Sequence, residues 1–431
     1  MTTNAIATLI LVGSFILFMV FRLEICYAMG MSTVLALLYL KVPLSIVFQG
    51  LVNGSADFTL LAIPFFVFMG DLMCAGKITD RIMDLAQELV GWMRGGLAMV
   101  NCVASLLFGG ISGSPVADTA SLGPIECDLM GKGGYPADWS WSLTMATSIQ
   151  GMLIPPSHNM VIYAVAAGSV SIGALLMAGV LPGVVLCIVM CIYSYTYAKK
   201  KNIPVTGRFS AKGLGRAIIT AFFPMLTVVI VVGGVVGGIM TATESACFAV
   251  LYALVLTLFI LRTIPLRKLY SVARKTCCTM ASIMVLMGVS SGFGWVVAYL
   301  GIPKMVSTFM FSVTNNRFVL LLITNVLLLF LGCFMSMGSI LLIMTPILLP
   351  ILKSVGVDPV QFGVIMIMNC GVGLCTPPVG GVLFVGSGIS GIKLEKLSKT
   401  MLPFYGFMVI ALLLMTYIPQ LSLWLPSVLI H

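Results

Sequence analysis

The sequence predicts an all-α integral membrane protein built from two inverted repeats, and three observations support that prediction. The 431-residue chain is 60% hydrophobic and only 8% charged, whereas roughly 25% of the residues of a soluble domain are charged. Apolar segments of membrane-spanning length recur from one end to the other. Clusters of Gly and Pro interrupt these segments at corresponding places in the two halves. We expect roughly 10 to 12 membrane-spanning helices, plus partial spans, in one membrane domain.

The longest apolar segments are expected to cross the bilayer as single helices. They are Ala5–Phe21, Phe58–Leu72, Ile172–Tyr197, Ala217–Ile239, Ala246–Leu261, Thr279–Leu300, Phe318–Phe334 and Met401–Trp424. The first has neither a basic region before it nor a small-residue cleavage site after it, so we expect a retained helix rather than a signal peptide.

The formal net charge of +10 is explained by short cytoplasmic loops rich in Lys and Arg, and no nucleic-acid partner is expected. Two apolar runs separated by "GGIMTATES" (237–245) lie between the two densest basic clusters, so both clusters should face the cytoplasm. The clusters are Lys199, Lys200, Lys201, Arg208, Lys212 and Arg216, and then Arg262, Arg267, Lys268, Arg274 and Lys275. The cysteines are scattered on apolar segments, so neither disulfides nor a transition-metal site is expected.

A weak self-similarity relates the two halves at an offset of roughly 222 residues. In the first half "LLFGG" (106–110) precedes a polar break, and "IPPS" (154–157) follows. In the second half "LFLGC" (329–333) precedes "FMSMGS" (334–339), and "TPPVG" (376–380) follows. Chance alignment in a Gly-rich chain is the alternative, but the double proline matches in both halves. Interrupted helices in corresponding places are typical of secondary transporters.

These landmarks divide the single membrane domain, 1–431, into segments, each repeat having a re-entrant hairpin and a broken helix. We expect N-terminal scaffold helices over 1–57 and linking scaffold helices over 184–275. The first repeat is expected over 58–183, with its hairpin near 105–128 and its broken helix near 139–167. The second is expected over 276–408, with its hairpin near 329–352 and its broken helix near 360–389, followed by the C-terminal end of the last helix over 409–431.

The four breaks predict two sites for a weakly held monovalent cation such as sodium. Unpaired backbone at membrane depth is tolerated only where it is buried in protein or lines a wet cavity. Proline frees a carbonyl in the preceding turn, and uncharged oxygens suit such a cation. One set of expected ligand positions is Ser112, Gly113, Ser114, Pro155, Pro156 and Ser157, and the other is Ser336, Gly338, Ser339, Thr376, Pro377 and Pro378. No other cofactor is expected.

Four further residues near the breaks are candidates for the substrate cavity or for coupling: Asp118, His158, Asn159 and Gly380. Three roles stay open for Asp118, namely an acceptor that shapes the hairpin, an indirect part in cation binding, and proton coupling. His158 fits a packed polar residue better than a proton carrier. Glu244 is expected to cap the helix that follows it. Helix N-termini at the breaks favour an anionic substrate between the two sites.

With these residues in view, the chain resembles the large membrane subunit of tripartite ATP-independent periplasmic (TRAP) transporters over nearly its whole length. The motifs that carry the resemblance are "GDLMCAGKITDRI" (70–82), "GWMRGGLAMVN" (91–101), "FGGISGSPVADTASLG" (108–123), "IPPS", "TATESA" (241–246), "GVDPVQFG" (356–363), "TPPVGGVLFVG" (376–386) and "PQLSLWLP" (419–426). Pro115 and the absence of a proline in "TATES" depart from the commoner family pattern, but neither departure removes an expected ligand.

The resemblance implies a sodium-driven importer of organic acids in the bacterial inner membrane, with C4-dicarboxylates, sialic acid and other carboxylates as family substrates. It implies an elevator mechanism, in which the hairpins and broken helices slide against a scaffold. It also implies two partners: a small four-helix membrane subunit, here a separate polypeptide, and a periplasmic substrate-binding protein.

Two other functions stay open at this stage. One is a stand-alone anion transporter of related architecture. The other is an intramembrane serine protease, because "GISG" (110–113) matches the G-x-S-G of rhomboid proteases and His158 would serve as base for Ser112. That reading leaves the second copy of the break unexplained.

The stretch Lys77–Arg94 is amphipathic and has two interpretations. Ile78, Ile82, Leu85 and Leu89 recur at helical spacing. It either lies along the membrane interface as a scaffold arm or forms a short connector helix.

Overall fold

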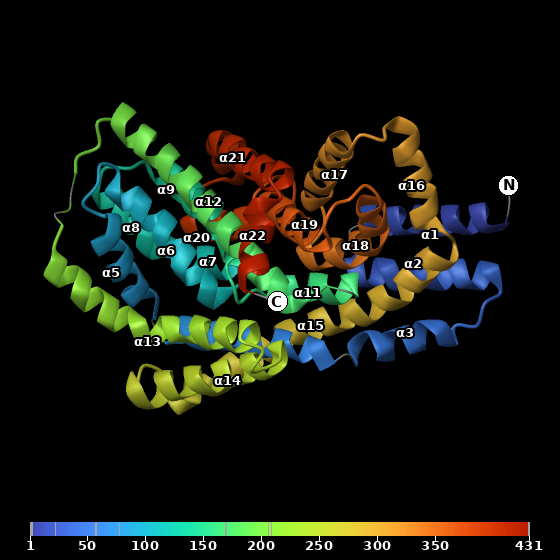
Figure 1. Ribbon diagram of the computed structural model, residues 1–431, viewed down its shortest axis with the longest axis horizontal. Helices are drawn as coiled ribbons and strands as arrows, with labels where there is room; N and C mark the ends of the chain where they lie inside the picture. The colour runs from blue at the N-terminus through green and yellow to red at the C-terminus, as the bar shows by residue number, and fades with distance from the viewer. Residues whose placement is uncertain are drawn as a thin grey trace.

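The protein is described by a computed structural model that covers residues 3–21, 23–56, 58–76, 78–168, 170–205, 207 and 209–429. Every regular element in these ranges is helical (Figure 1). Eight helices in the described ranges are long and apolar enough to cross a membrane, and shorter apolar helices accompany them. The all-α membrane fold predicted from composition is therefore confirmed. Lys77 and Arg208, named above, lie outside the described residues.

One group of helices forms an elongated layer along one side of the molecule. It comprises α1 (Thr3–Val20), α2 (Ile25–Leu40), α3 (Ser45–Ser55), η1 (Phe58–Leu61), α4 (Ala62–Ala75), α5 (Ile78–Val90), α13 (Ala211–Val236), α14 (Ala242–Val255), η2 (Leu256–Ile260), α15 (Leu266–Tyr299) and α16 (Ile302–Val313). The long helix α15 packs against α2, α3 and α4, and α13 packs against α5 and α14. In Figure 1 α15 and α3 run side by side beneath the rest of the right-hand part.

The remaining helices follow the same order in each half of the chain. The first half contains α6 (Gly96–Ser112), α7 (Pro115–Ser121), α8 (Gly123–Lys132), α9 (Ala137–Ser148), α10 (Gln150–Leu153), α11 (His158–Ala167) and α12 (Ile172–Lys200). The second half contains α17 (Arg317–Gly332), α18 (Met337–Ser354), α19 (Pro359–Leu374), α20 (Gly381–Ser390), α21 (Leu394–Tyr417) and α22 (Gln420–Leu429). Each half thus has a helix, a break, a further helical segment, and then a helix that is itself interrupted.

The two halves interlock at their breaks. Helix α7, which follows the first break, packs against α20, which follows the last one. Helix α11 in turn packs against α18, which follows the break in the second hairpin. The longer helices of the two halves also contact each other, since α9 packs against α21 and α19 packs against α12. All four breaks are therefore held in one helical body.

Some helix boundaries differ from the sequence prediction. The expected span Phe318–Phe334 is the 16-residue helix α17, which ends at Gly332, and the helix after it, α18, is 18 residues long despite Pro346 and Pro350. The expected final helix is divided into α21 and α22 around Ile418 and Pro419, because proline supplies no amide hydrogen to continue the ladder.

The amphipathic stretch is a helix, α5, with Ile78, Ile82 and Leu85 buried as expected. Leu89 was expected on the same buried face but is 39% exposed. It lies in the last turn of α5. Arg94 follows the helix end at Val90.

Candidate cation and substrate site

The first helix break lies between α6 and α7. Helix α6 ends at Ser112, and Gly113 adopts a left-handed conformation with φ of 61°, which glycine reaches without steric cost. Ser114 then caps α7, since its side chain accepts a hydrogen bond from the amide of Ala117 at 3.4 Å. Pro115 occupies the first turn of α7, where its missing amide hydrogen costs nothing.

The "IPPS" break converges on this tip. A methyl group added to Gly113 would lie 2.9 Å from the carbonyl oxygen of Pro156 and 3.6 Å from Nδ1 of His158. A methyl group on Gly110 would lie 3.2 Å from the carbonyl oxygen of Pro155. The structure thus places the Pro156 carbonyl beside the tip and the Pro155 carbonyl beside the last turn of α6.

Ser157 is the most unusual member of this set. Its side chain is fully buried, and its hydroxyl has no hydrogen-bond partner in the described part of the chain. Buried hydroxyls are almost always paired, so the unpaired hydroxyl of Ser157 is a candidate position for a ligand to an ion or a water molecule.

The second half has a tip and break of related geometry. Ser336 caps α18, and its hydroxyl lies 2.8 Å from that of Ser339. The amide of Val379 donates to the carbonyl of Cys333 at 3.1 Å, which joins the break directly to the tip. Both double prolines, at 155–156 and 377–378, have a cis peptide bond between them.

Close glycine contacts hold each tip against its broken helix. A methyl group on Gly109 would lie 2.5 Å from the Cα of Gly151, and one on Gly373 would lie 2.6 Å from the Cα of Gly332. Within each half, α6 touches α10 and α17 touches α19 at backbone distance, so the two contacts occupy equivalent places in the repeat.

The other predicted site residues have different surroundings. Thr376 donates its hydroxyl to the carbonyl of Val372 at 2.8 Å. Gly380 begins α20 with φ of 39°, and a methyl group there would lie 2.9 Å from the carbonyl oxygen of Thr376. Gly338 faces the side chain of Leu286 on α15. Asn159 is buried beside His158.

Two cavities lie at the tips, on the same helix α15. The first, of about 260 Å³, is lined by Ser112, Ser114 and His158 together with residues of α4 and α15 that include Asp71 and Lys275. The second, of about 700 Å³, is lined by Ser336, Ser339 and Pro378 together with Glu24 and mainly apolar residues of α1, α2 and α15. Sequence reasoning missed Asp71 and its contact with Lys275, although a lone carboxylate inside the apolar run Phe58–Leu72 is itself a signal.

Asp118 does not line the first cavity but lies buried behind it. Neither of its carboxylate oxygens has a hydrogen-bond partner among the described residues. A methyl group on Gly151 would lie 3.7 Å from the Ser112 hydroxyl and 3.9 Å from Oδ2 of Asp118, so both polar groups flank the same glycine. The amide of the neighbouring Gln150 is also buried and unpaired in the described chain.

A second buried carboxyl group, Glu126, lies in the same hairpin and was not singled out from the sequence. Its Oε2 accepts from the amide of Asn101 at 2.6 Å and from the hydroxyl of Thr144 at 3.0 Å. Thr147 extends the network by donating to Oδ1 of Asn101 at 2.8 Å. This network ties α6 and α8 to α9.

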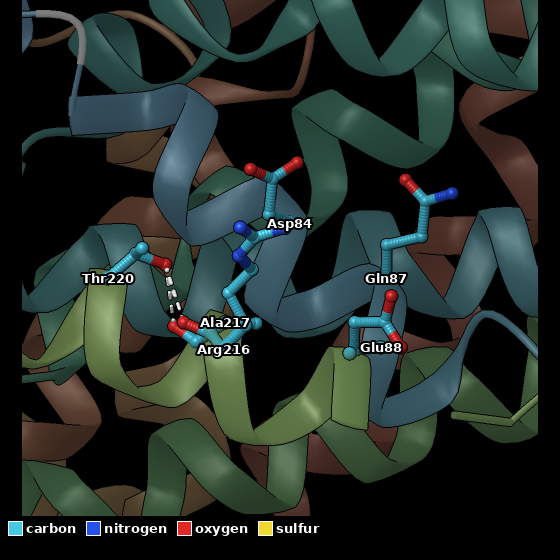
Figure 2. A pocket seen from close by; sticks show the side chains of 7 residues that line it. Asp84, Gln87, Glu88, Arg216, Ala217 and Thr220 are labelled. Carbon is cyan, nitrogen blue, oxygen red and sulfur yellow. Dashed lines mark hydrogen bonds between the residues drawn. The ribbon is translucent and has the colours of Figure 1, made fainter. Parts of the chain in front are cut away.

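A further cavity of about 370 Å³ lies away from the tips, between α5 and α13 (Figure 2). Asp84, Glu88 and Arg216 line it, and Figure 2 shows the acidic side chains on α5 and Arg216 on α13. Burial, followed by the charge of nearby Asp80, raises the pKa of Asp84. None of the predicted site residues borders this cavity, so it belongs to the junction between α5 and α13.

Glu244 caps α14 as the sequence predicted. Its Oε2 accepts from the amide of Thr241 at 2.8 Å, while the Thr241 hydroxyl accepts from the amide of Glu244 at 3.3 Å. This is the reciprocal capping box of a helix N-terminus.

Comparison with known proteins decides the family. Residues 12–421 match the family described as tripartite ATP-independent periplasmic transporter, DctM component. The chain belongs to the DctM family of TRAP transporters. It is 40% identical to the sialic acid TRAP transporter large permease protein SiaM of Vibrio cholerae over 380 residues, 88% of each chain. It is 33% identical to the C4-dicarboxylate TRAP transporter large permease protein DctM of Rhodobacter capsulatus, over 98% of this chain and 99% of the relative.

The fold of this DctM family member is shared with more distant transporters. The YdaH transporter of Alcanivorax borkumensis superposes with a TM-score of 0.61 at 15% identity, over 86% of this chain and 88% of that one. Family membership and the apolar helices identify a multi-pass protein of the bacterial inner membrane. The relatives are named as transporter permeases, so the chain is a TRAP large permease for organic acids and the protease interpretation is set aside.

Proposed function

We propose that this chain is the sodium-coupled large permease of a tripartite importer of an organic acid, and that it works as an elevator. The two tips, the two breaks and the helices between them would form the moving body, and the layer containing α1 to α5 and α13 to α15 would form the scaffold. The partners are a small four-helix membrane subunit and a periplasmic substrate-binding protein.

The observation that carries the proposal is the convergence of each tip with its double-proline break. In the first half, the Pro156 carbonyl lies beside Gly113 at the tip, the Pro155 carbonyl lies beside Gly110 in the last turn of α6, and the buried hydroxyl of Ser157 has no partner among the described residues. These are uncharged oxygen ligands, which sodium accepts and which hold it weakly enough to release it. We assign one sodium ion to each half.

The substrate of this system is an organic acid of the kind its relatives carry. Helices α11, α18 and α20 all begin at the breaks, and helix N-termini carry partial positive charge and free amide hydrogens. A carboxylate held between the two tips would complement that charge. SiaM is named for sialic acid, DctM for C4-dicarboxylates, and a relative in Escherichia coli for 2,3-diketo-L-gulonate.

Thermal unfolding of the purified protein tests sodium binding without the substrate or the partners. An ion that binds only the folded state stabilises it by about 2.7 kcal/mol at a hundredfold excess over Kd. We expect a saturable rise of the unfolding midpoint in NaCl that is absent from KCl and choline chloride of equal ionic strength.

The substitution Ser157→Ala should weaken the sodium response by removing a proposed ligand from the double-proline break while the tip stays intact. Ser142→Ala is the matched control, because Ser142 is equally buried but donates its hydroxyl to the carbonyl of Asp138 at 2.8 Å, away from any break. Equal curves in all three salts would contradict sodium coupling, and an unchanged response in Ser157→Ala would exclude this hydroxyl as a ligand.

The stand-alone alternative is tested in cells. Uptake should cease when the genes for the small subunit and the binding protein are deleted, and uptake that survives both deletions would overturn the tripartite arrangement.

A further inference from the structure

The scaffold wall of the first cavity carries an ion pair opposite the hairpin tip. Nζ of Lys275 on α15 lies 2.8 Å from Oδ1 of Asp71 on α4. Both residues line the cavity that also contains Ser112, Ser114 and His158. An isolated ion pair at this position has a functional or a fastening role, and the two partners differ in ways that separate these roles.

Asp71 is fixed and shielded, whereas Lys275 is accessible. The Asp71 side chain is 14% exposed, and its second oxygen, Oδ2, accepts a hydrogen bond from the hydroxyl of Thr276 at 2.8 Å. The Lys275 side chain is 70% exposed. An ammonium group has three donors, and only the bond to Asp71 occupies one of them among the described contacts, so two are free to meet a ligand.

Lys275 is also the only Lys or Arg among the residues that line this cavity in the described chain. The cavity at the second tip is lined by no Lys or Arg from the described residues and contains the carboxylate of Glu24. A carboxylate next to the tips therefore meets a lysine paired with Asp71 at the first tip, whereas Glu24 is the charged residue among the described lining of the second.

We propose that Lys275 binds the carboxylate of the transported acid on the cytoplasmic side of the hairpin tip, exchanging its bond with Asp71 for one with the substrate. Asp71 holds the ammonium group in place while the cavity is empty, and it competes with the substrate when the acid arrives. This competition keeps the acid from being trapped on the scaffold. The inference rests on the proposed transport of a carboxylate and names the residue that selects for its charge.

The experiment compares three variants of the purified protein in saturating NaCl. Binding is measured from the rise of the unfolding midpoint with sialic acid, succinate and 2,3-diketo-L-gulonate, and with succinamide as an uncharged analogue of succinate. Lys275→Met removes the proposed cation, Asp71→Asn removes its competitor, and Lys268→Met is the control, since Lys268 is exposed on the same helix and does not line the cavity.

We expect Lys275→Met to weaken binding of the preferred acid by roughly tenfold, because a charge-assisted hydrogen bond is lost. Asp71→Asn should instead tighten binding, and Lys268→Met should leave it unchanged. The opposite signs of the first two effects are the signature of competition, because a pair that only fastens α4 to α15 gives the same loss from either side.

Three results overturn the inference. Unchanged binding in Lys275→Met excludes the lysine, and equal losses in Lys275→Met and Asp71→Asn show a fastening role. Failure of the wild-type protein to bind any of the three acids contradicts the proposed function, and the inference with it. Retained sodium stabilisation in Lys275→Met shows that the variant is folded and that the sodium sites are intact.

Discussion

The first tip, at Ser112–Ser114, faces a scaffold wall with Lys275 and Asp71, whereas the second, at 336–339, faces Glu24 and mainly apolar side chains. The backbone of the two tips is nonetheless built alike. A serine caps the helix after each tip, and a glycine pair joins each tip to its broken helix. The two tips therefore share a backbone frame but differ in the charged side chains next to it.

The buried polar groups repeat this contrast. The first half buries the carboxyl groups of Asp118 and Glu126, whereas the second half buries amides. There the Asn369 side chain donates to Oδ1 of Asn325 at 2.9 Å, and Asn325 donates to the hydroxyl of Thr416 at 3.0 Å. Both networks join a hairpin helix to its broken helix, but only the first contains ionisable groups. Any coupling of transport to protons should thus depend on the carboxyl groups of the first half.

The largest expected effect tests the shared frame. Gly109→Ala and Gly373→Ala each put a methyl group against backbone atoms of the facing helix, which have to move apart. Overpacking of this kind costs about 1–3 kcal/mol or more, so both variants should lower the unfolding midpoint and abolish sodium stabilisation. Fluorescence-detected gel filtration after heating measures the midpoint.

Gly131→Ala is the matched control for the two glycine variants. Gly131 lies in α8 with no other atom within 4 Å of the added methyl group, and alanine is the better helix former. Its midpoint should be unchanged or slightly higher. A large loss in only one of the two test variants would show that the halves do not share the frame.

Much of this frame could be predicted from the sequence, because glycine and proline act through the backbone and leave a local signature. The double prolines, the Gly-Ser tips and the Glu244 cap were all found in that way. The contacts between Gly109 and Gly151 were not, since any of the 44 glycines fits a close contact equally well until the helices are placed. Asp71 and Lys275 are 204 residues apart, and no local pattern links them.

An intermediate effect tests the charged network against the neutral one. Glu126→Ala leaves the Asn101 amide without its carboxylate acceptor, for a loss of about 1–2 kcal/mol. Glu126→Gln should cost less than about 1 kcal/mol, because an amide oxygen accepts the same two hydrogen bonds. Asn369→Ala in the second half should resemble Glu126→Ala. The readout is the unfolding midpoint in choline chloride.

Comparing Glu126→Gln with Glu126→Ala also separates the role of Glu126 as a hydrogen-bond acceptor from the role of its charge. If Glu126→Gln is as damaging as Glu126→Ala, the carboxylate charge itself is needed, and the first half differs from the second in its chemistry as well as its composition. If Glu126→Gln retains sodium-dependent stability, Glu126 is a structural acceptor, and Asp118 is left as the buried carboxyl group of this hairpin to be tested for a part in coupling.

The smallest expected effect separates the capping role of the tip serines from their proposed role as ligands. In choline chloride no sodium is present, so the fall in unfolding midpoint reports only the lost cap and its local contacts. Ser336→Ala loses both the cap of α18 and the 2.8 Å contact with Ser339, whereas Ser114→Ala loses one long cap bond of 3.4 Å to a seven-residue helix. Loss of a cap costs about 0.5–2 kcal/mol, so Ser336→Ala should be the more destabilised.

The same two variants are then compared in NaCl. The order of their unfolding midpoints changes there only if the two serines contribute unequally to sodium binding, because the stability lost with each cap is the same in both salts. A difference between the two midpoints that is the same in both salts would mean that Ser114 and Ser336 contribute equally to sodium binding.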